Sequence, residues 1–134
     1  MTEFTMNTVV AAPYDETVAS VREQLVEAGF GVLTEIDMKA TLKAKLDVDI
    51  DPQVILGACR PQLAHQAVMA DPRLAALMPC NVVVAYVDED NTRVEVFDPQ
   101  AMSSFSDADT LDEIAADARA RMIGMLEAVG ATGA

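Results

Sequence analysis

The segment from Cys80 to Phe97 constrains the fold more than any other part of the chain. It reads CNVVVAYV, then DEDN, then TRVEVF. Two runs rich in β-branched residues with four polar residues between them are typical of a β-hairpin. The first run is apolar at nearly every position, whereas the second alternates. A strand that is apolar on both faces must be covered on both sides. Three or four modest helices do not supply that much cover.

Upstream of the hairpin, strand and helix patterns alternate. The β-branched run at 4–12 predicts a first strand. Asp15 can cap a helix whose apolar residues recur at helical spacing and which stops at Gly29. The branched and aromatic residues of 30–36 predict a second strand.

The middle of the chain continues this alternation. A short amphipathic helix is expected to begin after Asp37. The apolar segment 53–59 predicts a strand, and Pro61 suits the first position of the next helix. A brief helical turn follows, which Pro79 ends.

A capping box of Thr110 and Glu113 predicts the start of a last helix over about 110–129. No long linker divides the chain. We therefore expect one domain over 1–134, of α+β class, with a mostly antiparallel sheet of about five strands and the helices packed on one face.

The charge of the chain limits its partners. It carries 22 acidic and 9 basic residues, a net charge of −13, and its only lysines are Lys39, Lys43 and Lys45. Phosphate backbones and anionic lipid surfaces repel such a surface, so we expect neither nucleic acid nor membrane as a partner. Adaptation to a salt-rich cytoplasm and simple solubility both account for the acidity. The lysine segment suits a solvated helix face, an anionic ligand or the acidic face of a second copy.

The sequence favours a cytoplasmic protein. It begins with no basic stretch followed by an apolar one, as a secretory signal would. The run VVVAYV is far shorter than the ~20 residues of a membrane helix. Two cysteines do not make a disulfide framework, so we expect reduced thiols.

Two motifs carry a family resemblance: ILGAC-x-P at Ile55–Pro61 and LMPCNVVV at Leu77–Val84, followed by DP at Asp98. From about Thr17 to Met102 the chain resembles the family called domain of unknown function 302. The resemblance implies a small, dimeric α+β domain with a sheet similar to that of TATA-binding-protein-like folds, and it implies no activity. Arg60 departs from the family pattern, in which an asparagine often stands there, so a role that requires an amide is in doubt.

Cys59 is the first candidate functional residue. It ends a predicted strand directly before Arg60 and the start of a helix. A thiol beside a helix N-terminus and an arginine lies in positive potential, which favours the nucleophilic thiolate. A small buried cysteine beside a tightly packed helix is the competing interpretation.

Cys80 lies 21 positions after Cys59, so the two do not form a CxxC motif. They can meet only if their strands run antiparallel or the intervening turn brings the chain back. His65 alone offers itself as a further metal ligand, and the helical wheel turns it away from the apolar stripe. We expect no metal site, no cofactor and no catalytic residue.

Three functional hypotheses remain. The preferred one is a non-catalytic homodimeric binding or sensing module with a ligand site near Cys59, Arg60 and Cys80. The second is a thiol-dependent redox or sulfur-handling protein that uses Cys59. The third is a structural or interaction domain in which both cysteines are core residues.

Overall fold

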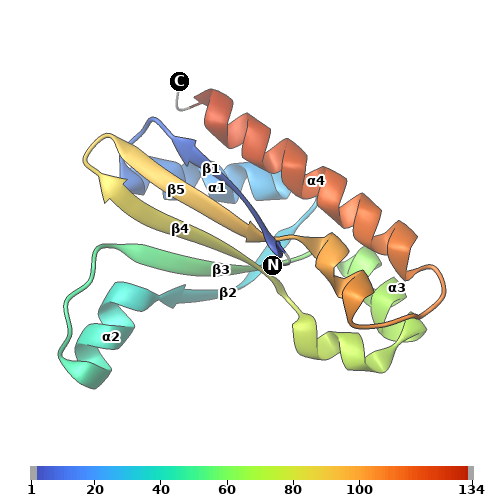
Figure 1. Cartoon of the computed structure of the whole chain (residues 1–134). Coiled ribbons are helices and arrows are strands. Elements are labelled where there is room, and N and C mark those ends of the chain that lie inside the picture. Colours follow the sequence, from blue (N-terminus) through green and yellow to red (C-terminus); the bar gives the residue numbers. More distant parts are fainter. Residues whose placement is uncertain (1–2, 133–134) are drawn as a thin grey trace.

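The computed structural model describes residues 3–132. Within this range the chain forms five strands, four α-helices and two 3₁₀ helices (Figure 1). The strands are β1 (Thr5–Val10), β2 (Gly31–Asp37), β3 (Gln53–Cys59), β4 (Cys80–Asp88) and β5 (Asn91–Phe97). The helices are α1 (Tyr14–Glu27), α2 (Met38–Leu46), α3 (Pro61–Ala70), η1 (Pro72–Leu77), η2 (Pro99–Ser104) and α4 (Leu111–Thr132).

The five strands form one sheet in the order β1-β5-β4-β3-β2, and every neighbouring pair is antiparallel. The predicted hairpin is β4 and β5. Its tip is held by the Asp88 carboxylate, which accepts from the backbone N–H of Asp90 and the side-chain amide of Asn91, both at 2.9 Å. The α+β class and the mostly antiparallel sheet are confirmed.

One face of the sheet is covered by α1 and α4. In the paired strands, Val54, Val84 and Val94 form a row across this face, and all three are buried. They join the helix residues Leu25 and Met122 in the first hydrophobic cluster. Burial of such side chains is the main force that holds helix and sheet layers together.

The opposite face of the sheet has no helix across its centre among residues 3–132 (Figure 1). On this opposite face, one row of paired residues runs across the sheet through Ile36, Ile55, Val83 and Glu95. The next row on the same face contains Ala85 and Arg93. We call these six residues the open face. Ile36 is 44% exposed, and Ile55, Val83 and Ala85 are half-buried. The second side of the apolar strand β4 therefore lacks the cover that its sequence requires.

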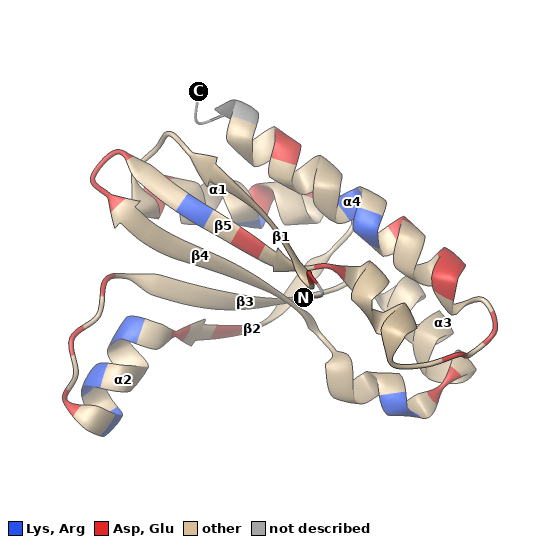
Figure 2. Cartoon of the chain, viewed as in Figure 1, with Lys and Arg blue, Asp and Glu red and all other residues tan. Residues whose placement is uncertain are grey.

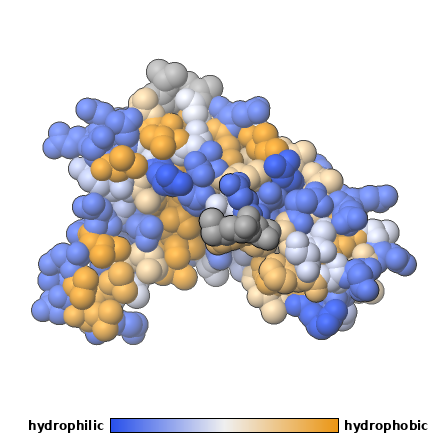
Figure 3. Space-filling model, in the orientation of Figure 1, coloured by the Kyte–Doolittle hydropathy of each residue, from blue (hydrophilic) through white to orange (hydrophobic). Residues whose placement is uncertain are grey.

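Hydrophobic atoms gather over this region of the molecule and over α2 (Figure 3). Helix α2 contacts β2 and β3. It presents Leu46 to solvent, and Val48 follows in the next loop, also exposed. All three lysines lie on α2, as Figure 2 shows, whereas acidic residues are spread over the other elements.

Both expected helix caps differ from the structure. Helix α2 begins after Asp37 as predicted, and the Asp37 carboxylate caps it by accepting from the N–H of Ala40 at 2.9 Å. Asp15 was wrong as a cap: Pro13 takes that position in extended backbone, and Asp15 lies in the first turn of α1. The capping box was also wrong. Thr110 has a φ of 68°, and no capping hydrogen bond from its side chain or that of Glu113 occurs within residues 3–132.

The end of α1 matches the predicted stop. Gly29 has a φ of +91°, the N–H of Gly29 donates to Val26 O, and the N–H of Phe30 donates to Leu25 O, both at 2.9 Å. This is the Schellman motif. Glycine is favoured at this position because a residue with a Cβ is strained in left-handed backbone. It turns the chain so that Phe30 is buried directly before β2.

A second hydrophobic cluster lies beyond the end of the sheet. It is built by α3, η1, η2 and the first half of α4, and it includes Leu63, Leu74, Met102 and Ile114. The core is therefore divided into a sheet cluster and a helix cluster. Within the described part of the chain, no helix is long and apolar enough to cross a membrane.

Candidate functional site

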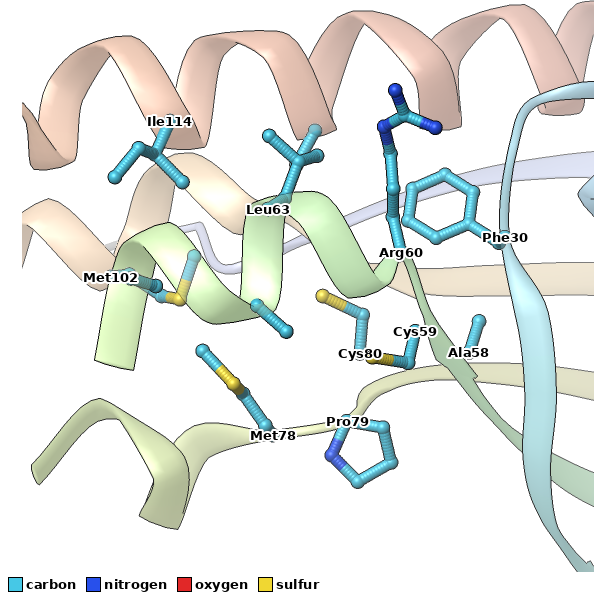
Figure 4. Close-up of a pocket in the computed structure, with 13 residues that line it drawn as sticks. Phe30, Ala58, Cys59, Arg60, Leu63, Met78, Pro79, Cys80, Met102 and Ile114 are labelled. Atoms are coloured by element: carbon cyan, nitrogen blue, oxygen red, sulfur yellow. The ribbon is translucent and has the colours of Figure 1, made fainter. Parts of the chain in front are cut away.

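A cavity of about 40 Å³ lies where the two hydrophobic clusters meet (Figure 4). The sheet cluster contributes Phe30, Ala58 and Cys80, while the helix cluster contributes Leu63, Met102 and Ile114. A void of this size has room for about three atoms the size of a water oxygen. Its remaining lining residues are Cys59, Arg60, Ala64, Ala67, Met78, Pro79 and Ala118.

The antiparallel pairing of β3 and β4 brings the two cysteines to the same end of the sheet. Ala58, the neighbour of Cys59, is the register partner of Cys80. Both cysteines are free and half-buried, and both line the cavity. The antiparallel pairing therefore brings both thiols to one cavity, which their spacing in the sequence left open.

The Cys80 thiol lies in an apolar environment. Burial raises its pKa to about 11, and the nearby Cys59 thiol contributes in the same direction. Because a thiolate is the reactive form of cysteine, Cys80 is held in its unreactive protonated state at neutral pH.

Arg60 links the cavity to α4. It is the N-cap residue of α3, and its side chain makes no capping bond to that helix. Instead it extends past Phe30 toward α4 (Figure 4). Its Nε is buried and has no hydrogen-bond partner within residues 3–132. A buried N–H without an acceptor costs free energy, so this atom stands out from the rest of the structure.

The structure thus places all three predicted ligand-site residues, Cys59, Arg60 and Cys80, on one cavity. Their role in binding stays a prediction. His65 is exposed on α3 and does not line the cavity, as its place on the helical wheel predicted. No group of three or more histidine, cysteine or carboxylate side chains suited to a metal occurs among the described residues.

Several cavity residues were missed by sequence reasoning. Phe30, Met78, Met102 and Ile114 all line it. Each carries only the signal of an apolar residue near a turn or on a helix stripe, and such residues are usually core. Their meeting depends on how the two clusters pack, which no local pattern records.

The chain is similar to proteins of one family. The family model described as "Domain of unknown function DUF302" matches residues 6–129. A crystal structure of an uncharacterized conserved protein DUF302 from Bacillus stearothermophilus is similar, with 28% sequence identity and a TM-score of 0.85. That similarity covers 96% of this chain and 99% of the other. No curated protein matches the chain. The predicted resemblance is confirmed: the chain belongs to the DUF302 family.

Proposed function

We propose that the protein is a non-catalytic homodimeric binding module whose small ligand occupies the cavity beside Cys59, Arg60 and Cys80. One observation carries the proposal: a partly open apolar cavity lies at the junction of the two hydrophobic clusters. Close packing is the rule in protein interiors, and ligand sites are mostly apolar hollows with a few placed polar groups. This void has one charged side chain, Arg60, among thirteen lining residues.

Binding is favoured over thiol chemistry by the surroundings of the cysteines. The cavity lining contains no carboxylate and no imidazole that could take a proton from a thiol. The raised pKa of Cys80 opposes thiolate formation at that residue. A thiol-dependent role for Cys59 is the second candidate, because Cys59 shares the cavity with Cys80. Alkylation of Cys59 faster than free cysteine at pH 7 would favour that role.

The binding function can be tested with butanamide, a neutral probe with a three-carbon tail that matches the void. We expect millimolar butanamide to shift the NMR signals of the Met78, Met102 and Ile114 methyl groups. Ala64→Leu places extra volume in the cavity and should abolish these shifts. Ala70→Leu, at an exposed position of the same helix, is the matched control and should leave them unchanged. Absence of shifts with the unmodified protein would refute the function.

The open face supports self-association. Its apolar part is Ile36, Ile55, Val83 and Ala85, and its two charged residues neutralise each other, because Arg93 Nε lies 2.7 Å from Glu95 Oε1. Two molecules that each carry −13 repel one another over most of their surface. The repulsion is smallest at the neutral, apolar open face. A second copy docked there would bury the exposed side of β4.

The dimer is tested by mass in solution. At micromolar concentration we expect the elution and light-scattering mass of two chains. Val83→Glu introduces a charge into the centre of the open face and should give a monomer. Val26→Glu, at a 66% exposed position on α1, is the control and should remain dimeric. A monomer mass for the unmodified protein refutes the dimer and leaves the ligand cavity to its own test.

A cytoplasmic location belongs to the same proposal. Cytoplasmic thiols are kept reduced, which suits two free cysteines at one cavity.

A further inference from the structure

We propose that the ligand of this cavity is a short-chain carboxylate, with its apolar tail in the void and its carboxylate on the guanidinium groups of Arg60 and Arg121. The inference rests on the proposed binding function and names the class of ligand. It comes from the arginines around Gly29, which the family match leaves without a role.

Arg60 differs from every other arginine of the protein. The chain has six arginines, and five of them pair with a carboxylate. The pairs are Arg22–Glu35, Arg73–Asp71, Arg93–Glu95, Arg119–Asp98 and Arg121–Asp117. The Arg60 side chain has no hydrogen bond or ion pair within residues 3–132, although its Nε is buried. In a chain with 22 acidic residues, an arginine without an acidic partner is unexpected.

A second guanidinium converges on the same place. A methyl group on Gly29 would lie 2.6 Å from Arg60 Nη1 and 3.3 Å from Arg121 Nη1. Arg121 is partly committed: its Nη1 donates to Ala28 O at 3.1 Å, and its Nε bonds to Asp117 at 3.2 Å. Asp117 therefore offsets part of the positive charge, but Arg60 and the rest of the Arg121 fork keep free donors.

The carbonyl groups at the end of α1 explain only part of this arrangement. A cation near a helix C-terminus is favourable, and Arg121 satisfies the Ala28 carbonyl directly. This role does not supply an acceptor for the buried Nε of Arg60. A planar carboxylate does so, because guanidinium donors match its two oxygens.

The position of Arg60 also fixes the orientation of the ligand. Its aliphatic stem passes Phe30 at the cavity wall, and its head lies toward α4 (Figure 4). Apart from Arg60, the cavity is lined by alkyl, aromatic and sulfur-containing side chains. A ligand with a charged head and a tail of about three carbons satisfies both regions at once.

The test compares sodium butanoate with butanamide, which has the same shape and no charge, at constant ionic strength. NMR titration of the cavity methyl groups gives both dissociation constants. We expect butanoate to bind at least about tenfold more tightly, as a charge-assisted hydrogen bond would provide. Arg60→Met should reduce the ratio to about one without changing butanamide binding, and Arg121→Gln should reduce it in part. Arg22→Gln, which removes an exposed arginine of α1 away from the cavity, should preserve the ratio.

Equal binding of the two probes to the unmodified protein overturns the inference and leaves the binding function intact. Failure of both probes overturns the function and the inference together. A preference for butanoate that survives in folded Arg60→Met also overturns the assignment. The comparison in the unmodified protein decides the charge preference even if that variant does not fold.

Discussion

Gly29 lies directly against the guanidinium of Arg60. It is the one glycine of the described chain with a positive φ. Gly29→Ala should destabilise the protein by about 1 kcal/mol or more, because an alanine at a φ of +91° is strained and its methyl displaces Arg60 Nη1. Urea unfolding measures the change. Gly124→Ala is the control, because a Cβ there meets nothing within 4 Å. Alanine has the higher helix propensity, so this variant should gain about 0.5–1 kcal/mol of stability. A loss in both variants would contradict the explanation.

Gly57 permits a close approach between β3 and the chain before β4. A methyl group there would lie 2.7 Å from Pro79 Cγ and would also collide with the Thr34 side chain. Gly57→Ala should cost about 1–3 kcal/mol through overpacking. Gly31→Ala in the same sheet meets only the Cys59 carbonyl, at 3.9 Å, and should be nearly neutral. Thermal or urea unfolding of both variants checks the difference, and equal stability of the two would exclude this contact as the cause.

The Cys80 thiol should be slow to react. Its pKa of about 11, against an ordinary value of 9.0, lowers the thiolate fraction at pH 7–8 about a hundredfold. In Cys59→Ala, where Cys80 is the one remaining cysteine, iodoacetamide labelling should be slower than that of free cysteine by most of this factor, because burial, the larger cause of the shift, remains. Cys80→Ala reports Cys59 in the same assay. Labelling of Cys80 at the rate of free cysteine would contradict its burial.

The same shift affects stability at alkaline pH. Because the folded pKa of Cys80 lies above the unfolded one, its stabilising contribution is complete below the unfolded pKa and is lost as the pH rises through about 11. The free energy of unfolding of the unmodified protein, relative to Cys80→Ala, should therefore fall by about 2–3 kcal/mol over that range. Urea unfolding at pH 8 and pH 10.5 tests this. A difference that is independent of pH would be the contrary result.

The Asp71 carboxylate should stabilise the protein at neutral pH, and this stabilisation should be lost in acid. Its carboxylate accepts from Arg73 Nη2 at 2.8 Å and from Ser106 Oγ at 2.7 Å, and these bonds hold its pKa well below the usual range. The stabilisation is present above the unfolded pKa of about 4 and is lost as the pH falls through the lower folded pKa. Asp71→Asn should lower the melting temperature at pH 7 and have less effect at pH 2. Asp109→Asn, an exposed control, should have little effect at either pH.

Local patterns in the sequence predicted the elements well, because β-branched runs, helical spacing and Gly29 act over a few residues. They were weaker at helix starts. Pro13 fixes extended backbone one residue before α1, so Asp15 falls inside the helix. Thr110 adopts a positive φ that its residue type does not indicate. In both places the backbone before the helix determined which residue could cap it.

The site was predictable only in part, for a different reason. The motifs identified Cys59, Arg60 and Cys80, but their shared cavity follows from the antiparallel pairing of β3 with β4. The approach of Arg121 to Arg60 depends on α4 crossing the end of α1, a contact between residues about sixty positions apart. Periodicity carries no information about such contacts.

The division of the core into two clusters has a consequence for how the molecule comes apart. The cavity lies at their boundary, so the side chains that line it lack van der Waals partners on that side. The α3–η1–η2 region is thus the part best placed to open by itself, exchanging its amide hydrogens before the sheet does. A ligand bound there, as proposed above, should restore these contacts and slow that exchange.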